Sequence, residues 1–189
     1  MRKLLGWLTL FAALPLFGGC AVAVLGGAAA GGVLLAEDRR TVGTMTEDQG
    51  IELKAGSRIG ERVRDAHLNI TSFNRLILLT GEVPNAAARE DAERIARAVE
   101  NVRGVFNEVQ VAGNTALSSR TNDAFLTSKV KARFVDGQQF NPIHVKVVTE
   151  NSVVYLMGLV KRAEAEGATE VARTTGGVRK VVRLFEYLD

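Results

Sequence analysis

The chain contains few side chains that could act as nucleophiles or metal ligands. Among 189 residues there are one cysteine, Cys20, and two histidines, His67 and His144. The sequence has no phosphate-binding, zinc-hydrolase or nucleophile-elbow motif. A single cysteine excludes a disulfide within the chain, and with only two histidines it argues against a Cys/His zinc site. We therefore expect no catalytic residue, no metal site and no cofactor, and a protein that is not an enzyme.

The two histidines occupy equivalent places in an internal repeat, each just before a predicted strand. A shared functional site would require further ligands, and we expect no carboxylate or cysteine to accompany either histidine. His67 and His144 are therefore interpreted as structural residues at strand starts.

Cys20 follows a segment with the features of an export signal. Residues 2–3 are basic, residues 4–17 are uncharged and apolar, and residues 18–19 are glycines directly before the cysteine. The segment resembles the bacterial lipoprotein box, in which the cysteine thiol is diacylglycerated and becomes the new N-terminus after cleavage. Phe17 departs from the aliphatic residue usual in that box. The resemblance implies lipidation of Cys20.

A membrane-spanning helix is the alternative for this region, because apolar character continues from Leu4 to Ala36. Frequent glycines after Cys20 argue against it. Ala21, rather than Asp, follows the cysteine, and by resemblance to lipoprotein sorting this indicates the outer membrane. We expect a signal peptide at 1–19 and a lipidated N-terminus with a Gly/Ala-rich tether at 20–45.

The remaining chain repeats itself, which is its most informative feature. A shift of 77 positions aligns residues 67–99 with 144–176. Eight of the 33 aligned positions are identical: His67/His144, Asn74/Asn151, Leu79/Leu156, Gly81/Gly158, Val83/Val160, Ala86/Ala163, Ala88/Ala165 and Glu93/Glu170. The apolar pattern agrees over the same span. We therefore expect two similar domains, at 46–112 and 122–189, joined by a linker at 113–121.

Each domain is predicted to have the order αββαβ, from helical and alternating apolar patterns. In the first domain we expect helices at 47–66 and 86–100, a hairpin of strands around 68–72 and 76–83, and a closing strand through Val105, Val109 and Val111. In the second domain we expect helices at 123–135 and 162–175 and strands at 145–149, 153–160 and 181–187. The fold class is α+β, with a small three-stranded mixed sheet packed by two helices in each domain. Gly81 and Gly158 are interpreted as glycines where a helix approaches the sheet closely.

This order, with Gly-x-Val in the second strand of each domain and Gly177-Val178 after the last helix, resembles the BON domain. At the equivalent place in the first domain the pair is Asn101-Val102, which departs from the Gly-Val of this pattern. Arg40-Thr41-Val42-Gly43-Thr44, Asn122-Asp123 and Thr149-Glu150-Asn151 add to the likeness. Together with the lipoprotein box, they resemble a family of outer-membrane lipoproteins with two BON domains.

The helix that opens the second domain carries the candidate binding surface. Leu126, Val130 and Phe134 share its core-facing side. The opposite arc consists of Phe125, Ser128, Lys129, Lys131, Ala132 and Val135. An aromatic ring beside lysines suits a membrane interface, because the ring enters the headgroup boundary and the ammonium groups meet phosphates. Packing of Phe125 against the other domain, with solvated lysines, is the alternative. Arg58 is taken as the first-domain counterpart of Phe125.

Charge distinguishes the two domains. Residues 45–114 contain 9 basic and 11 acidic side chains, whereas residues 120–189 contain 11 and 8. Only the second domain should be attracted to anionic lipid. The overall charge of +3 is too small to indicate nucleic-acid binding.

The family resemblance implies that the second domain binds anionic phospholipids, such as phosphatidylglycerol and cardiolipin, through this helix. A tryptophan occupies the position of Phe125 in that family. The resemblance further implies a lipid-anchored protein on the periplasmic face of the outer membrane. There it would support envelope integrity and act at the division site, with the outer-membrane assembly machinery or septal amidase regulators as partners. A second hypothesis is a protein–protein adaptor that docks through the first domain's acidic surface and exposed strand edges, with lipid contact only through Cys20.

Overall fold

The computed structural model describes residues 37–113 and 117–189. The expectations for the signal peptide, for Cys20 and for most of the tether lie outside these residues. Residues 39–189 form one compact unit. In the part of the chain that is described, no helix has the length and apolar character needed to cross a membrane.

The first domain has the predicted order of elements. They are α3 (Val42–Arg62), β1 (His67–Phe73), β2 (Leu76–Val83), α4 (Ala86–Arg97), β3 (Gly104–Asn107) and β4 (Gln110–Val111). The sheet runs β1-β2-β3, with β4 also paired to β2. β1 and β2 are antiparallel, and β3 and β4 run parallel to β2. The predicted closing strand is thus split into two short strands, and Glu108 and Val109 separate them.

The second domain repeats the arrangement with an unbroken last strand. Its elements are α5 (Leu117–Gly137), the short 3-10 helix η2 (Pro142–His144), β5 (Val145–Glu150), β6 (Val153–Val160), α6 (Arg162–Arg173) and β7 (Lys180–Tyr187). The sheet order is β5-β6-β7, with β5 antiparallel and β7 parallel to β6. The predicted α+β fold of two similar domains is confirmed.

Both opening helices begin earlier than predicted. α3 begins at Val42 because Thr41 caps it, with the Thr41 hydroxyl oxygen accepting a hydrogen bond from the backbone N–H of Thr44 at 3.1 Å. α5 begins at Leu117, so it includes part of the predicted linker. The apolar pattern marks only where a helix touches its core, and a first turn beyond that core lies outside the pattern.

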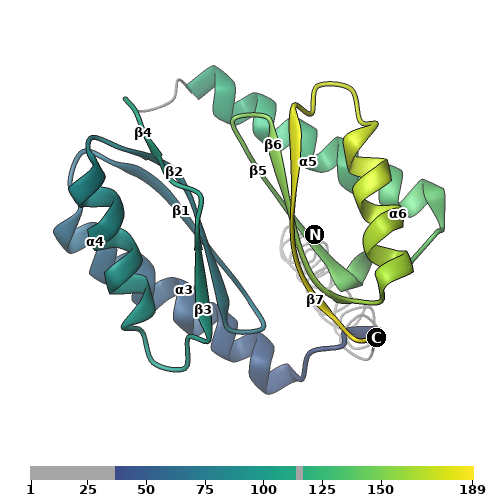
Figure 1. The fold of residues 1–189 in the computed structure, drawn as a ribbon, viewed down its shortest axis with the longest axis horizontal. Coiled ribbons are helices and arrows are strands. Elements are labelled where there is room, and N and C mark those ends of the chain that lie inside the picture. The colour runs from purple at the N-terminus through teal and green to yellow at the C-terminus, as the bar shows by residue number, and fades with distance from the viewer. Residues whose placement is uncertain (1–36, 114–116) are drawn as a thin grey trace, which may run out of the picture. The chain divides into compact units, whose positions relative to one another are not determined.

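Each domain has its own apolar core between its sheet and its two helices. Ile51, Ala55 and Ile59 of α3 pack in the first core, and Val130 and Phe134 of α5 pack in the second. The predicted core face of α5 is therefore confirmed. In Figure 1 the helices of each domain lie on one side of its sheet.

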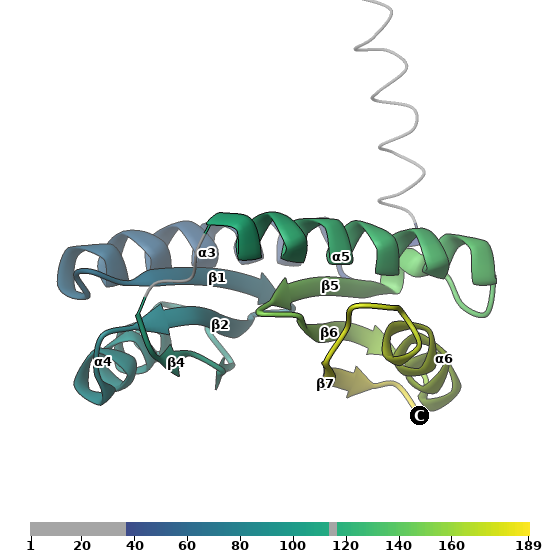
Figure 2. The same cartoon turned by 90° about the horizontal axis from the view of Figure 1, so that it is seen from above.

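The opposite faces of the two sheets form a third core. Its buried members are Phe73, Leu78, Tyr155, Met157 and Leu184, so both domains contribute. Figure 1 shows the two sheets facing each other, with the helices on the outer sides, and Figure 2 shows the same elements from above. Polar bonds flank this core: the amide of Asn74 donates to Glu186 and that of Asn151 donates to Glu82, each at 2.7 Å. The two domains therefore pack sheet to sheet.

The two strand glycines have a different role from the predicted one. A Cβ on Gly81 would lie 2.0 Å from the carbonyl oxygen of His67, and one on Gly158 would lie 2.4 Å from that of His144. The close approach is thus between neighbouring strands, and the expectation of a helix contact was wrong. Gly81 also has a φ of +107°, which L side chains rarely adopt.

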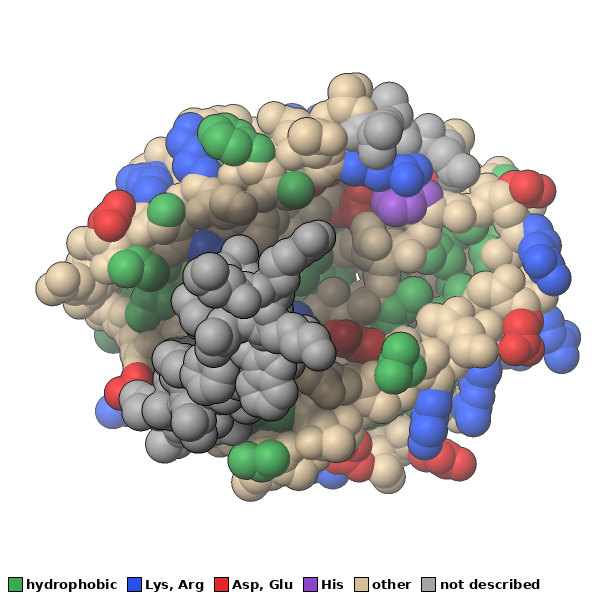
Figure 3. All heavy atoms as spheres, turned by 180° about the vertical axis from the view of Figure 1, so that it is seen from behind, with side chains coloured by type: hydrophobic (Ala, Val, Ile, Leu, Met, Phe, Trp, Pro, Cys, Tyr) green, Lys and Arg blue, Asp and Glu red, His purple; other side chains and the backbone are tan. Residues whose placement is uncertain are grey.

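The histidines do mark strand starts. His67 is the first residue of β1, and His144 directly precedes β5. Their backbone carbonyl groups lie against Gly81 and Gly158, which explains why glycine recurs at this place in the repeat. Figure 3 shows a histidine side chain at the surface, beside acidic and basic side chains.

Candidate functional site

α5 is fixed to its sheet by apolar packing along one side. Leu126, Val130 and Phe134 are at most 2% exposed. The Phe134 ring also meets the Phe140 ring edge-on, with centroids 4.9 Å apart. This packing fixes the rotation of the helix about its axis, and so decides which side chains face outward.

A buried aspartate near the start of each opening helix fixes the helix to the hairpin turn. The Asp123 carboxylate accepts hydrogen bonds from the backbone N–H groups of Asn151 and Ser152 at 2.9 and 2.8 Å. Both turn residues have positive φ, 50° and 61°, as expected for a tight hairpin turn. This contact sets the position of α5 along its axis.

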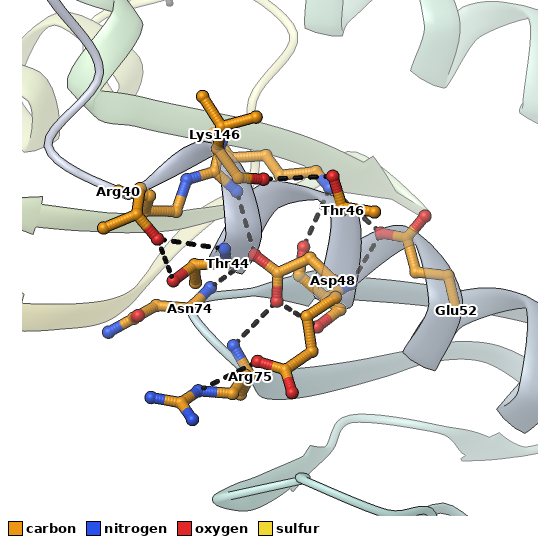
Figure 4. A network of polar contacts seen from close by, with 12 residues as sticks. Arg40, Thr44, Thr46, Asp48, Glu52, Asn74, Arg75 and Lys146 are labelled. Atoms are coloured by element: carbon orange, nitrogen blue, oxygen red, sulfur yellow. Dashed lines mark hydrogen bonds and ion pairs between the residues drawn. The ribbon is translucent and has the colours of Figure 1, made fainter.

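Asp48 performs the same role in the first domain, with more partners (Figure 4). Its carboxylate accepts bonds from the backbone N–H groups of Asn74 and Arg75 at 2.8 and 2.7 Å. It also accepts a bond from the Ser72 hydroxyl at 2.7 Å and pairs with Arg40 at 3.0 Å. Asp48 and Asp123 are thus structural equivalents.

The predicted arc lies on the outer side of α5. Phe125 is 64% exposed and Val135 is 63% exposed. Ser128, Lys131 and Ala132 are exposed as well. Ten residues of helix place Phe125 and Val135 about 15 Å apart along the axis. The ring and the valine are therefore two separate apolar points on one surface, with Lys131 between them in sequence.

Lys129 differs from the other members of the arc because it is half-buried. Its ammonium group donates a hydrogen bond to the backbone carbonyl of Gly176 at 3.0 Å, beyond the end of α6. No carboxylate is involved, so the positive charge is not neutralised by this contact. For Lys131, no hydrogen bond or ion pair is found within residues 37–113 and 117–189.

The structure corrects the comparison of the two opening helices. Ile51 and Leu126, each the third residue after its domain's equivalent aspartate, are both buried in the core. In that alignment the counterpart of Phe125 is Gly50, and the expectation that it is Arg58 was wrong. Helical periodicity recurs at every turn and strand spacing does not fix the helix register, which the equivalent contacts of Asp48 and Asp123 establish.

Arg58 instead corresponds to Arg133. Arg58 donates to the carbonyl of Ala98 at 3.4 Å, directly after α4. Arg133 donates to the carbonyl of Val171 at 2.9 Å, in the last turn of α6. Both arginines satisfy carbonyl groups at the C-terminal end of a helix, where a cation is favoured. Their role is structural.

The corrected alignment makes the surfaces of the two domains more different. Gly56 and Gly60 occupy the positions of Lys131 and Val135. An added Cβ at Gly50, Gly56 or Gly60 would meet nothing within 4 Å, so all three face open space. The first domain therefore presents bare helix backbone where the second domain presents a ring, a lysine and a valine.

Carboxylates accompany both histidines, and the expectation that none would do so was wrong. One ligand atom each of His67, Glu82 and Glu150 lie within 4.8 Å of one another. His144 Nδ1 lies 3.6 Å from a carboxylate oxygen of Glu164. These groups are far apart in sequence and come from different strands and helices, so local sequence patterns carry no signal for them.

The pKa values of Glu164 and Glu150, the carboxylates beside the two histidines, are shifted in opposite directions. Two hydrogen bonds from Arg39, at 2.6 and 2.8 Å, are the main cause that lowers the pKa of Glu164 to about 2. Burial is the main cause that raises the pKa of Glu150, and the neighbouring Glu82 carboxylate adds to it, against a hydrogen bond from Asn69. Arg39 thereby fixes the start of the compact unit to α6.

Comparison with known proteins gives matches along most of the chain. The BON domain family matches residues 47–113 and 122–189. The chain is 36% identical over 175 residues to the outer membrane lipoprotein DolP of Haemophilus influenzae, covering 90% of each protein. It is 30% identical over 155 residues to the 21 kDa hemolysin of Actinobacillus pleuropneumoniae, covering 80% of each. It is 27% identical over 145 residues to the osmotically-inducible protein Y of Escherichia coli, covering 74% of this chain and 72% of that protein.

Proposed function

The chain belongs to the BON-domain family, and from this we propose that it is an outer-membrane lipoprotein whose second BON domain binds anionic phospholipid through α5. The observation that carries the proposal is the outward Phe125 ring, 64% exposed on the more basic domain. A phenyl ring leaves water readily for the boundary between headgroups and acyl chains, and lysines near it attract lipid phosphates.

The contrast between the domains supports a specific role for the second one. Three glycines, Gly50, Gly56 and Gly60, stand where α5 carries Phe125, Lys131 and Val135, and an added Cβ at each would face open space. A helix surface that only faces solvent does not require a combination of apolar and cationic side chains, so the combination on α5 supports a specific contact. The first domain therefore lacks the ring, the lysine and the valine at the equivalent positions.

Anchoring through Cys20 is the second part of the proposal. The lipoprotein box supports it, as does the likeness to a protein named an outer membrane lipoprotein. An acyl anchor keeps the BON domains near the bilayer, and the resulting effective concentration lets a weak contact by α5 be occupied. We place the protein on the periplasmic face, where lipid binding would serve envelope integrity and the division site.

Vesicle flotation of residues 37–189 with a Phe125→Glu variant tests the lipid contact without the anchor. Burying a Phe side chain contributes about 1.5–3 kcal/mol, of which the exposed part of Phe125 supplies about two thirds. Since 1.4 kcal/mol is tenfold, and the new carboxylate repels anionic lipid, we expect affinity for phosphatidylglycerol vesicles to fall about 10- to 100-fold.

Leu53→Glu is the matched control, because Leu53 is 76% exposed on α3 of the first domain. It introduces the same charge at an exposed apolar residue, and binding should be retained. Vesicles of phosphatidylcholine alone should bind neither variant nor the unmodified domains. Equal binding of the unmodified and Phe125→Glu proteins to anionic vesicles would refute the proposed surface.

A further inference from the structure

Three side chains that can bind metal ions meet at the junction of the two BON domains. His67 belongs to β1, Glu82 to β2 and Glu150 to β5, so both domains contribute. One ligand atom of each lies within 4.8 Å of the other two. Tetrahedral coordination with bonds of about 2.1 Å separates ligand atoms by about 3.4 Å, so small side-chain rotations would complete a site.

Both carboxylates at this junction are buried. Glu82 is 1% exposed and Glu150 is 6% exposed. The hydrogen bonds that Glu150 accepts come from neutral groups, the Asn69 amide at 2.7 Å and the Thr80 hydroxyl at 3.3 Å. Buried carboxylates are normally paired with cations or bound to metal ions. Two carboxylates and one imidazole whose ligand atoms lie this close together suit a cation rather than an apolar or anionic ligand.

The cluster is also held in place and accessible. The Asn69 amide lies 2.7 Å from Glu150 and 3.4 Å from Nε2 of His67, so one group contacts two of the three side chains. Partners of this kind orient metal ligands in known sites. A cavity of about 490 Å³ is lined by His67, Glu150, Asp123 and Arg120, among others, and gives the cluster a route to solvent.

The carboxylates are not a by-product of the internal repeat. Under the shift of 77 positions, Glu82 corresponds to Leu159 and Glu150 corresponds to Phe73. The histidine recurs in the second domain, but neither acidic residue has an acidic counterpart. The cluster thus combines one repeated residue with two that are specific to their places at the junction.

We propose that His67, Glu82 and Glu150 bind a divalent transition-metal ion of the Zn²⁺ type. One imidazole with two carboxylates is a ligand set that Zn²⁺ accepts, with water as the fourth ligand. The ion links β1 and β2 of the first domain to β5 of the second. Its binding fixes the two sheets against each other and stabilises the folded state by mass action.

Calorimetric titration of the full chain with Zn²⁺ alone tests the proposal. The chain is kept in detergent micelles and carries Cys20→Ser, which removes the thiol as a competing ligand. We expect one equivalent to bind, and a rise in the midpoint of thermal unfolding. His67→Asn and Glu150→Gln should each weaken binding on the order of 100-fold or more, and Asn69→Ala, which keeps all three ligands, about 10-fold.

Glu166→Gln is the control, because it removes an exposed acidic side chain on α6 away from the junction. It should bind Zn²⁺ as tightly as the parent chain. Replacing Zn²⁺ by Co²⁺ gives a second measurement, since visible absorption bands of a four-coordinate ion should appear in the parent and disappear in His67→Asn. Circular dichroism confirms that each variant is folded. Absence of saturable binding by the parent, or unchanged binding in the His67→Asn and Glu150→Gln variants, overturns the site.

Discussion

Replacement of Asp48 by alanine should destabilise the protein more than the same replacement of Asp123. Both aspartates are buried, at 3% and 4% exposure, and both hold the hairpin turn of their domain. Asp48 accepts four hydrogen bonds, from Arg40, Ser72, Asn74 and Arg75. Asp123 accepts two, both from backbone N–H groups of its turn.

The number of bonds sets the expected difference. Each hydrogen bond contributes about 1 kcal/mol net, and a buried donor left without an acceptor costs at least as much. Asp48→Ala should therefore lower the free energy of unfolding by about 4 kcal/mol, and Asp123→Ala by about 2 kcal/mol. The difference of about 2 kcal/mol is well above the error of a comparative denaturation experiment.

Urea denaturation of residues 37–189, followed by circular dichroism, measures both changes. Asp91→Ala is the control, since Asp91 is 51% exposed and pairs only with Arg94 on the surface of α4. Its effect should stay within about 0.5 kcal/mol. Equal losses for Asp48→Ala and Asp123→Ala, or a larger loss for Asp123→Ala, would show that the hairpin contacts do not carry the stability assigned to them.

Two further predictions concern stability. Glu164 has a pKa of about 2 against an ordinary value of 4.5, so its contribution is present above pH 4.5 and is lost as the pH falls toward 2. Urea denaturation should show Arg39→Ala destabilising the protein at pH 6, with a gap that narrows as the pH falls through about 2 and then keeps only the part due to the Arg39 hydrogen bond to the Leu159 carbonyl; a gap independent of pH would contradict this assignment. Gly81→Ala should cost more than about 2 kcal/mol in the same assay, because the new Cβ meets the His67 carbonyl and the φ is positive. A loss below 0.5 kcal/mol, on the order of a neutral surface change, would contradict the close strand approach.

The sequence by itself determined the elements and the core-facing side of each helix. Alternating and helical apolar patterns are local, so β6 was predicted at its observed limits, Val153–Val160. The burial of Ile51, Ile59 and Phe134 follows from the same periodicity. Outward exposure of Phe125 could be predicted too, because the core side of a helix defines its opposite side.

Only the tertiary structure decided what depends on contacts between distant residues. Gly81 faces a neighbouring strand rather than a helix, and the counterpart of Phe125 is Gly50 rather than Arg58. Sequence similarity between repeats aligns strands well, but the insertion between helix and strand is invisible until the buried aspartates show the helix register.

The sheet-to-sheet packing of the two domains also depends on contacts between distant residues. Phe73 and Tyr155 pack in one core although 82 positions separate them, and no pattern within either domain indicates which surface meets the other. The same packing brings Glu150 of the second domain to His67 of the first. Local periodicity fixes which way a side chain points, whereas the identity of its neighbour depends on how the whole chain closes.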